Sequence, residues 1–321
     1  MVKSFVRGAF ILMLAASVNR VIGFIYQAVI YRLIGPEGMG LFNLVYPVYI
    51  LIIVVATAGI PLGISKLVSE AEVRGNRRGS YQILWLSLVI LVCSGIFFTL
   101  ISYLTAPLLK QHVFVNPKVY PIFLCLLPGV TLVSVSSAFR GFFQGLLNMK
   151  PPAVGQVAEQ IARVIVGLTL ATMLLPRGIQ WAVVGLAASS IIGEFIGFIV
   201  MVSIFIRSKP VNFRIELPHF NDSIEILRQL FDMCTPITLG RIAATIMLTA
   251  DSLLIPIMLK KVGFSTSMAT VLYGQLTSVA LTLLFIPSVI TVSLATSLVP
   301  AISEAVAQNR PHVVSSRTST A

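Results

Sequence analysis

The sequence predicts an all-α polytopic membrane protein. Hydrophobic residues make up 57% of the 321 residues and charged residues only 11%, whereas a soluble domain averages about 25% charged residues. Eight apolar stretches each reach the length of roughly 20 residues that one helical crossing of a bilayer requires. Composition and segment length therefore point to the same fold class, a bundle of membrane-spanning helices.

The eight predicted spans follow one another with short loops between most of them. They lie near residues 9–33, 41–65, 81–106, 119–147, 153–175, 181–206, 230–259 and 273–302. The start of the chain resembles a signal peptide, but its apolar run continues past Arg20 to about Leu33, and no small-residue cleavage site ends it. We therefore expect the first span to be retained.

Glycine and proline patterns single out some of these spans. The motif Gly-x-x-x-Gly occurs at residues 59–63, 141–145 and 193–197, and it predicts faces on which helices pack closely. Prolines inside spans remove a helix hydrogen bond and permit a kink. They are Pro47, Pro128, Pro236, Pro256 and Pro287.

Basic residues between the spans predict the orientation. If the N-terminus is cytoplasmic, the loops on that side hold thirteen Lys and Arg residues and the outer loops six, and the other four of the 23 lie inside spans. Because cytoplasmic loops are enriched in Lys and Arg, we expect a multi-pass protein of the cell membrane with both termini in the cytoplasm. The net charge of +12 is then a sign of orientation and not of nucleic-acid binding.

One loop, residues 207–229, is long enough to be a linker and carries four basic and three acidic side chains. We expect an N-terminal lobe of six transmembrane helices at 1–206, this cytoplasmic linker, the first two helices of a C-terminal lobe at 230–304, and a polar tail at 305–321. On this interpretation the chain is truncated partway through the second lobe.

A weak internal repeat supports two lobes. Residues 64–71 and 298–305 both end in Ser-Glu-Ala at an offset of 234 positions, and the same offset pairs Gly40 with Gly274. Both copies close an even-numbered span, so the lobes would have the same orientation, as in a parallel repeat about an axis along the membrane normal. Chance similarity between apolar sequences is the alternative.

Seven charged side chains lie within the predicted spans and more than two residues from either end, where a charge costs about 2.5–3.5 kcal/mol and persists only if it is paired or faces a watery cavity. They are Arg20, Arg140, Glu159, Arg163, Glu194, Arg241 and Asp251. These residues are our candidates for function.

The arginines are candidates to bind an anion. Arg20 lies twelve residues from Arg32, about 18 Å along a helix, so its side chain cannot easily reach the interface and a polar cavity is expected around it. A guanidinium grips phosphate in bidentate fashion, and Arg241 is a second candidate for such a site. Arg140 lies near the cytoplasmic end of its span and either faces the cavity or extends to the interface.

The acidic residues have two interpretations. Glu159 and Arg163 are four residues apart on the fifth span, which places opposite charges on one helix face, where they would neutralise each other. Glu194 and Asp251 are candidates either to carry a coupling proton or sodium ion or to pair with Arg140 or Arg241. Together these four residues form the set of ion-coupling or charge-pair candidates.

Enzymatic and metal-binding functions find little support. The three histidines, His112, His219 and His312, are scattered in loops, and no His-Glu-x-x-His or aspartate-rich motif occurs. The three cysteines have no paired spacing, which argues against a disulfide framework and a zinc site. We expect no catalytic residue, no metal and no cofactor.

Several segments together resemble one protein family. They are residues 19–24, Asn-Arg-Val-Ile-Gly-Phe; 35–42, Gly-Pro-Glu-Gly-Met-Gly-Leu-Phe; 59–71; 139–145, Phe-Arg-Gly-Phe-Phe-Gln-Gly, with Asn148 and Met149; and 298–304. In combination they resemble the polysaccharide-transport branch of the multidrug/oligosaccharidyl-lipid/polysaccharide flippase superfamily, whose members have about fourteen spans in two repeated lobes.

The resemblance implies a function in sporulation and cell-wall synthesis. It implies that the protein moves an undecaprenyl-pyrophosphate-linked saccharide, expected to be the peptidoglycan precursor of the spore cortex, across the membrane by alternating access. Arg20 matches a first-helix arginine that helps form a cationic cavity in related peptidoglycan-lipid flippases. Where those flippases carry a second arginine six residues on, this chain has Tyr26, and their arginine of the second span has no counterpart here.

Two other functions stay open at this point. A cation-coupled multidrug exporter would need acidic residues in its cavity, which would make Glu159, Glu194 and Asp251 central. A non-transporting sporulation membrane scaffold would not need Arg20 at mid-depth. The expected partners are the lipid-linked saccharide, membrane lipids and, in a coupled carrier, a cation; nucleic acid is not expected.

Overall fold

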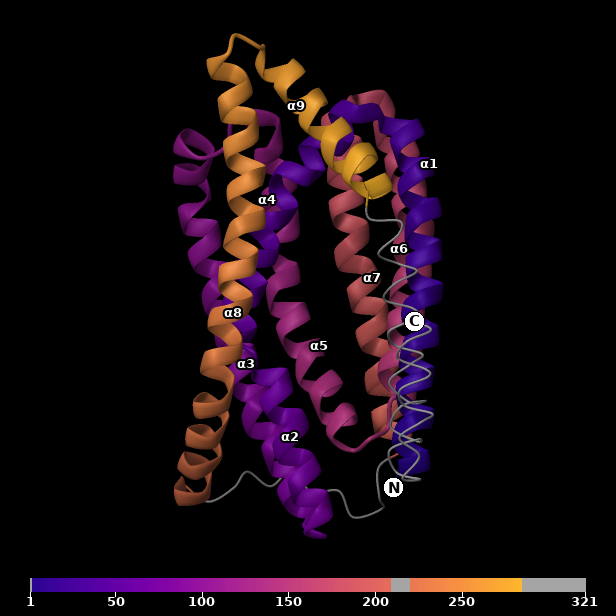
Figure 1. Cartoon of the computed structure of the whole chain (residues 1–321), viewed down its shortest axis with the longest axis vertical. Helices are drawn as coiled ribbons and strands as arrows, with labels where there is room; N and C mark the ends of the chain where they lie inside the picture. The colour runs from indigo at the N-terminus through magenta and orange to yellow at the C-terminus, as the bar shows by residue number, and fades with distance from the viewer. Residues whose placement is uncertain (1, 209–219, 285–321) are drawn as a thin grey trace, which may run out of the picture.

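The computed structural model describes residues 2–208 and 220–284, and in this part the chain forms helices joined by short turns (Figure 1). Seven helical segments within it are long and apolar enough to cross a membrane. The expected all-α polytopic membrane fold is therefore confirmed. The first of the seven segments, Leu12–Val73, covers both the first and the second predicted spans.

Helix α1 (Val2–Thr57) contains the first predicted span and most of the second, with a sharp bend between them. The bend is at Gly35, whose φ of 68° is a conformation that only glycine adopts at little cost. Pro36 follows it, so one backbone donor is lost at the same place. After α1, Ala58 and Gly59 both have positive φ, and α2 (Ile60–Val73) begins.

The middle of the chain forms the body of the bundle. Its elements are α3 (Arg77–His112), η1 (Pro117–Val119), α4 (Tyr120–Leu126), α5 (Pro128–Gly145), α6 (Lys150–Leu174), η2 (Leu175–Arg177) and α7 (Ile179–Arg207). Pro128 divides the fourth predicted span into α4 and α5, because a proline at the first position of α5 supplies no donor to the preceding turn. The other middle spans are each a single long helix.

The last part of the described chain comprises α8 (Phe220–Lys261), α9 (Thr266–Gln275) and the π-helical turn η3 (Leu276–Ala280). Because α8 begins at Phe220, residues 220–229 of the predicted linker are helical. In Figure 1, α9 crosses from the end of α8 to the bend of α1. The rest of the eighth predicted span, with Pro287, and the predicted tail at 305–321 lie outside the described residues.

Glycine residues set the close helix contacts, as the motifs predicted. A Cβ at Gly197 of α7 would lie 2.8 Å from the carbonyl oxygen of Gly155 in α6, and a Cβ at Gly145 of α5 would lie 2.7 Å from that of Ser65 in α2. A Cβ at Gly63 would meet Cys234 Sγ of α8 at 2.8 Å. The prediction of close packing at all three motifs is confirmed.

The contact between α1 and α9 joins positions that are 234 residues apart. A Cβ at Gly40 would clash with the carbonyl oxygen of Thr270, and a Cβ at Gly274 would clash with that of Pro36. Gly40 and Gly274 differ by 234 positions, and so do Pro36 and Thr270, so the contact is reciprocal, as in a pairing of two equivalent surfaces. One turn on, the Asn43 side chain donates a hydrogen bond of 2.8 Å to Thr277, again at an offset of 234.

Candidate functional site: a polar cavity with two arginines

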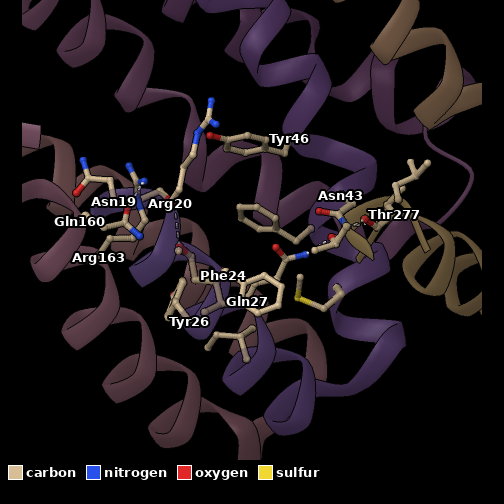
Figure 2. A pocket seen from close by; sticks show the side chains of 18 residues that line it. Asn19, Arg20, Phe24, Tyr26, Gln27, Asn43, Tyr46, Gln160, Arg163 and Thr277 are labelled. Carbon is tan, nitrogen blue, oxygen red and sulfur yellow. Dashed lines mark hydrogen bonds between the residues drawn. The ribbon is translucent and has the colours of Figure 1, made fainter. Parts of the chain in front are cut away.

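A cavity of about 800 Å³ lies where the two halves of α1 meet α6, α7 and η3 (Figure 2). Its polar lining comes from four separate parts of the chain. The polar side chains are Asn19, Arg20, Tyr26, Gln27, Asn43, Tyr46, Gln160, Arg163, Ser190, Thr277 and Thr282. Aromatic and aliphatic residues, such as Phe24 and Phe42, complete the wall.

One face of the first half of α1 supplies much of this wall. Asn19, Gly23, Tyr26, Gln27 and Ile30 are spaced at three, four, seven and eight positions along the helix, which places them on a single stripe. This stripe carries amide and hydroxyl groups within an otherwise apolar helix. It therefore faces the cavity, and Arg20 and Phe24, which lie between its members, widen the part of the helix that lines the cavity.

The charged lining of the cavity is basic. Arg20 and Arg163 line it, and no Asp or Glu side chain does so in the described part of the chain. Arg20 is exposed and makes no hydrogen bond or ion pair with any residue of that part. Its charge is thus available to a solute that enters the cavity.

Behind Arg163 lies a network of four charges from three helices. Arg140 of α5 donates to Glu194 of α7 at 2.6 Å and to Glu159 of α6 at 3.3 Å. Glu159 also accepts from Arg163 at 2.5 Å. Two positive and two negative side chains balance one another, which is what mutual pairing of charges within a membrane requires.

The network binds one edge of Arg163 and leaves another donor free. Its Nη1 donates to Gln160 at 3.2 Å, and its Nη2 is bound by Glu159. The Nε atom is buried without a hydrogen-bond partner in the described chain. The Oδ1 atom of Asn19, which lies on the same side of the cavity in Figure 2, is also buried and unpartnered.

Tyr26 extends from α1 between α6 and α7. A Cβ on Gly167 of α6 would clash with the Tyr26 hydroxyl and would come within 2.9 Å of Ser189 Oγ of α7. Gly167 therefore leaves the space that the tyrosine ring occupies. Tyr26 forms part of the cavity wall without adding a charge.

The structure brings together some of the residues that the sequence singled out and not others. Arg20, Tyr26 and Arg163 line the cavity, and Arg140, Glu159 and Glu194 form the network with Arg163. Arg241 and Asp251 are both exposed on α8 and do not line the cavity. The predicted pair Glu159 and Arg163 is present, within a larger network than their spacing indicated.

Eight amide or hydroxyl residues of the cavity were not predicted: Asn19, Gln27, Asn43, Tyr46, Gln160, Ser190, Thr277 and Thr282. None of them carries a charge, and charge was the main signal that distinguished candidate residues inside the spans. An uncharged amide inside a span is also costly to bury, and Gln27 lies seven positions from Arg20, nearly two helical turns away. Its amide, on the same helix as Arg20, is thus a sequence signal for the cavity.

The donors of the cavity can be compared with those that a metal ion needs. No group of three or more His, Cys, Asp or Glu side chains there is arranged to hold a metal ion. The cavity contains amides, hydroxyls and two guanidinium groups, which are donors suited to an anionic or hydroxyl-rich ligand.

Comparisons with known proteins agree with one another. The family model described as polysaccharide biosynthesis protein matches residues 5–306. Stage V sporulation protein B of Bacillus subtilis is 36% identical over 320 residues, 98% of this chain and 61% of that protein. Lipid II flippase MurJ of the same organism is 31% identical over 213 residues, 63% of this chain and 39% of that protein. The chain thus spans about three fifths of the length of the first of these relatives.

Solved structures share the fold. A MOP superfamily transporter from Pyrococcus furiosus superposes with a TM-score of 0.68 at 16% identity, covering 98% of this chain and 67% of that one. A multidrug resistance MATE family transporter of the MOP superfamily, in an inward-facing conformation, gives 0.69 at 14% identity, covering 94% and 65%. At these identities the likeness extends to the fold alone.

Proposed function

Because the chain belongs to the polysaccharide biosynthesis protein family, we propose that it moves an undecaprenyl-pyrophosphate-linked saccharide across the cytoplasmic membrane by alternating access. Its substrate on this proposal is the peptidoglycan precursor for the spore cortex. The names of two relatives, stage V sporulation protein B and lipid II flippase MurJ, support this proposal. The polar cavity is where the head group would bind.

The sign of the charge in the cavity carries the proposal. Two arginines and no carboxylate line the cavity in the described chain, and Arg20 has no protein counter-charge there. A pyrophosphate group loses its hydration when it enters such a site, and guanidinium groups compensate for that loss with charge-assisted, bidentate hydrogen bonds. An exporter of cationic drugs would need the opposite charge on its wall.

The positions of the acidic residues also favour an anionic substrate. Glu159 and Glu194 are engaged by Arg140 and Arg163. Asp251 is exposed on α8, away from the cavity. None of the three candidate carboxylates therefore presents a negative charge to a solute in the cavity, and the cation-exporter alternative loses its main support.

The volume of the cavity and its uncharged polar lining suit a sugar-bearing head group. A volume of about 800 Å³ lies in the upper part of the range of roughly 300–1,000 Å³ that is usual for organic ligands, and it is far larger than a bare ion needs. Amides such as Gln27, Asn43 and Gln160 both donate and accept hydrogen bonds. They can thus pair with saccharide hydroxyls next to the phosphate site.

Removal of the Arg20 charge tests the proposal. In proteoliposomes that contain the undecaprenyl-pyrophosphate-linked saccharide, we expect Arg20→Ala to abolish translocation, because the bound anion would lack a counter-charge at a cost of several kcal/mol. Arg20→Lys should retain part of the activity, since the charge remains while the bidentate fork is lost. Arg177→Ala, which removes an exposed arginine from η2, is the matched control and should translocate normally. Equal losses in Arg20→Ala and Arg177→Ala would contradict a specific role for Arg20.

A further inference from the structure

We propose that Glu159 is an internal counter-ion that occupies Arg163 in the empty cavity and that the substrate phosphate displaces it. Arg163 is then the second phosphate ligand beside Arg20, and Glu159 sets how tightly the substrate is held. The inference rests on the proposed function and deepens it by assigning two residues of the charge network to substrate binding and release.

The hydrogen bonds of Arg163 show that its present partners do not use all of its donors. Glu159 binds Nη2 at 2.5 Å and Gln160 binds Nη1 at 3.2 Å, while Nε is buried without a partner. A buried donor without an acceptor is unfavourable, so the guanidinium gains if it turns to an oxygen-rich anion in the cavity that it lines. A phosphate can bind Nε and one Nη together, in the bidentate arrangement typical of arginine.

Glu159 has a second partner to which it can stay bound. Its Oε2 atom lies 3.3 Å from Arg140 Nη2, while Oε1 binds Arg163. Arg140 in turn binds Glu194 at 2.6 Å. When a phosphate replaces Glu159 on Arg163, Glu159 keeps Arg140 as its counter-charge and is not left unpaired in the membrane interior.

The charge balance makes this exchange reversible. Without substrate, the network of Arg140, Glu159, Arg163 and Glu194 has equal numbers of positive and negative side chains. A carrier must release its substrate, and Glu159 competes with the bound phosphate for the Arg163 guanidinium, with which it pairs in the empty cavity. Glu159 therefore weakens binding and favours release.

Binding of farnesyl diphosphate to the purified full chain tests the proposal, with farnesol as the probe that lacks the phosphates. We expect Glu159→Gln to bind farnesyl diphosphate about tenfold more tightly than the unaltered protein, because the charge that competes with the phosphate for Arg163 is removed. Arg163→Gln should bind it more weakly. In the Arg163→Gln background, adding Glu159→Gln should give little further change, since the effect passes through Arg163. Farnesol affinity should stay the same in all variants.

Glu70→Gln is the matched control. Glu70 also forms an ion pair with a basic residue four positions away, Lys66, but on the exposed surface of α2. The Glu70→Gln variant should leave the affinity for both probes unchanged. It changes the net charge of the protein as Glu159→Gln does, so it separates a local effect of Glu159 from an effect of the net charge. If Glu70→Gln raised the affinity for farnesyl diphosphate equally, or if Glu159→Gln raised the affinity for farnesol, the proposed displacement of Glu159 by phosphate would be wrong.

The outcomes also separate this inference from the proposed function. If the unaltered protein binds farnesyl diphosphate and Glu159→Gln binds it no more tightly, the counter-ion role of Glu159 is wrong while the anion site stands. If the unaltered protein does not bind farnesyl diphosphate, both the anion site and the role of Glu159 are contradicted.

Discussion

Individual charges in this protein are divided between two tasks. Arg20 faces the cavity without a partner in the described chain, whereas Arg140, Glu159 and Glu194 are held in a paired network. The sequence predicted that Arg20 needs a polar cavity, because its distance from the interface follows from helix geometry alone. It could not predict the contact of Arg140 with Glu194, because those residues are 54 positions apart and meet only through the packing of α5 with α7.

The contact between Tyr26 and Gly167 gives a prediction at the same scale. Gly167→Ala should lower stability by about 1–3 kcal/mol, the usual cost of overpacking, because the new methyl group would clash with the Tyr26 hydroxyl. Tyr26→Phe removes that hydroxyl, so the double variant should recover part of the loss. Thermal unfolding of the three variants in detergent measures the effect. A double variant no more stable than Gly167→Ala would show that the hydroxyl does not fill this space.

Among the elements, α1 shows which features of a helix the sequence can predict and which it cannot. The sequence predicted two spans at 9–33 and 41–65, and the backbone of α1 is non-helical at Gly35, so two helical segments lie before and after that residue, as the two spans require. The bend at Gly35 and the break at Gly59 both need positive φ, which the Gly-Pro and Gly-Ile-Pro sequences permit. The angle between the two helical segments could not be predicted, because it depends on what each segment packs against. Here α9 and α6 pack against the two halves.

The crossing of α1 and α9 tolerates no side chain at its glycines. Gly274→Ala should destabilise the protein by about 1–3 kcal/mol, because the added methyl group meets the backbone at Pro36 and Gly40, which cannot move aside as a side chain can. Gly240→Ala on α8 is the matched control, since nothing lies within 4 Å of its Cβ. It should stabilise the helix by about 0.5–1 kcal/mol. Opposite changes in the midpoint of thermal unfolding are expected, and a neutral Gly274→Ala would contradict the close contact.

For the whole molecule, the sequence predicted the fold class and the family resemblance well, since both depend on long apolar segments and specific motifs. The division into lobes at residues 206 and 230 stays a prediction. The contacts at an offset of 234, Asn43 with Thr277 and Gly40 with the α9 surface, are what two equivalent units in the same orientation would form. The cavity includes residues of both predicted units, so its outline could not be found from either part alone.

The orientation in the membrane is a separate prediction for the whole molecule. Arg74 and Lys261 are both exposed, and in Figure 1 the ends of α2 and α8 next to them lie at opposite ends of the bundle. With Cys93, Cys125 and Cys234 replaced, we expect Arg74→Cys to be shielded from an impermeant thiol reagent added to intact cells and Lys261→Cys to react. This follows from the excess of basic residues in the cytoplasmic loops. Labelling of Arg74→Cys from outside would show that the orientation is reversed.

The central claim, that the cavity selects an anionic head group, is tested most directly by comparing two variants of opposite charge in one translocation assay. At equal membrane abundance, Arg20→Ala should lose transport of the undecaprenyl-pyrophosphate-linked saccharide, because Arg20 supplies an unpaired positive charge to the cavity. Asp251→Asn should keep most of it, because Asp251 lies outside the cavity on α8. Normal translocation by Arg20→Ala, or a greater loss in Asp251→Asn, would contradict the claim.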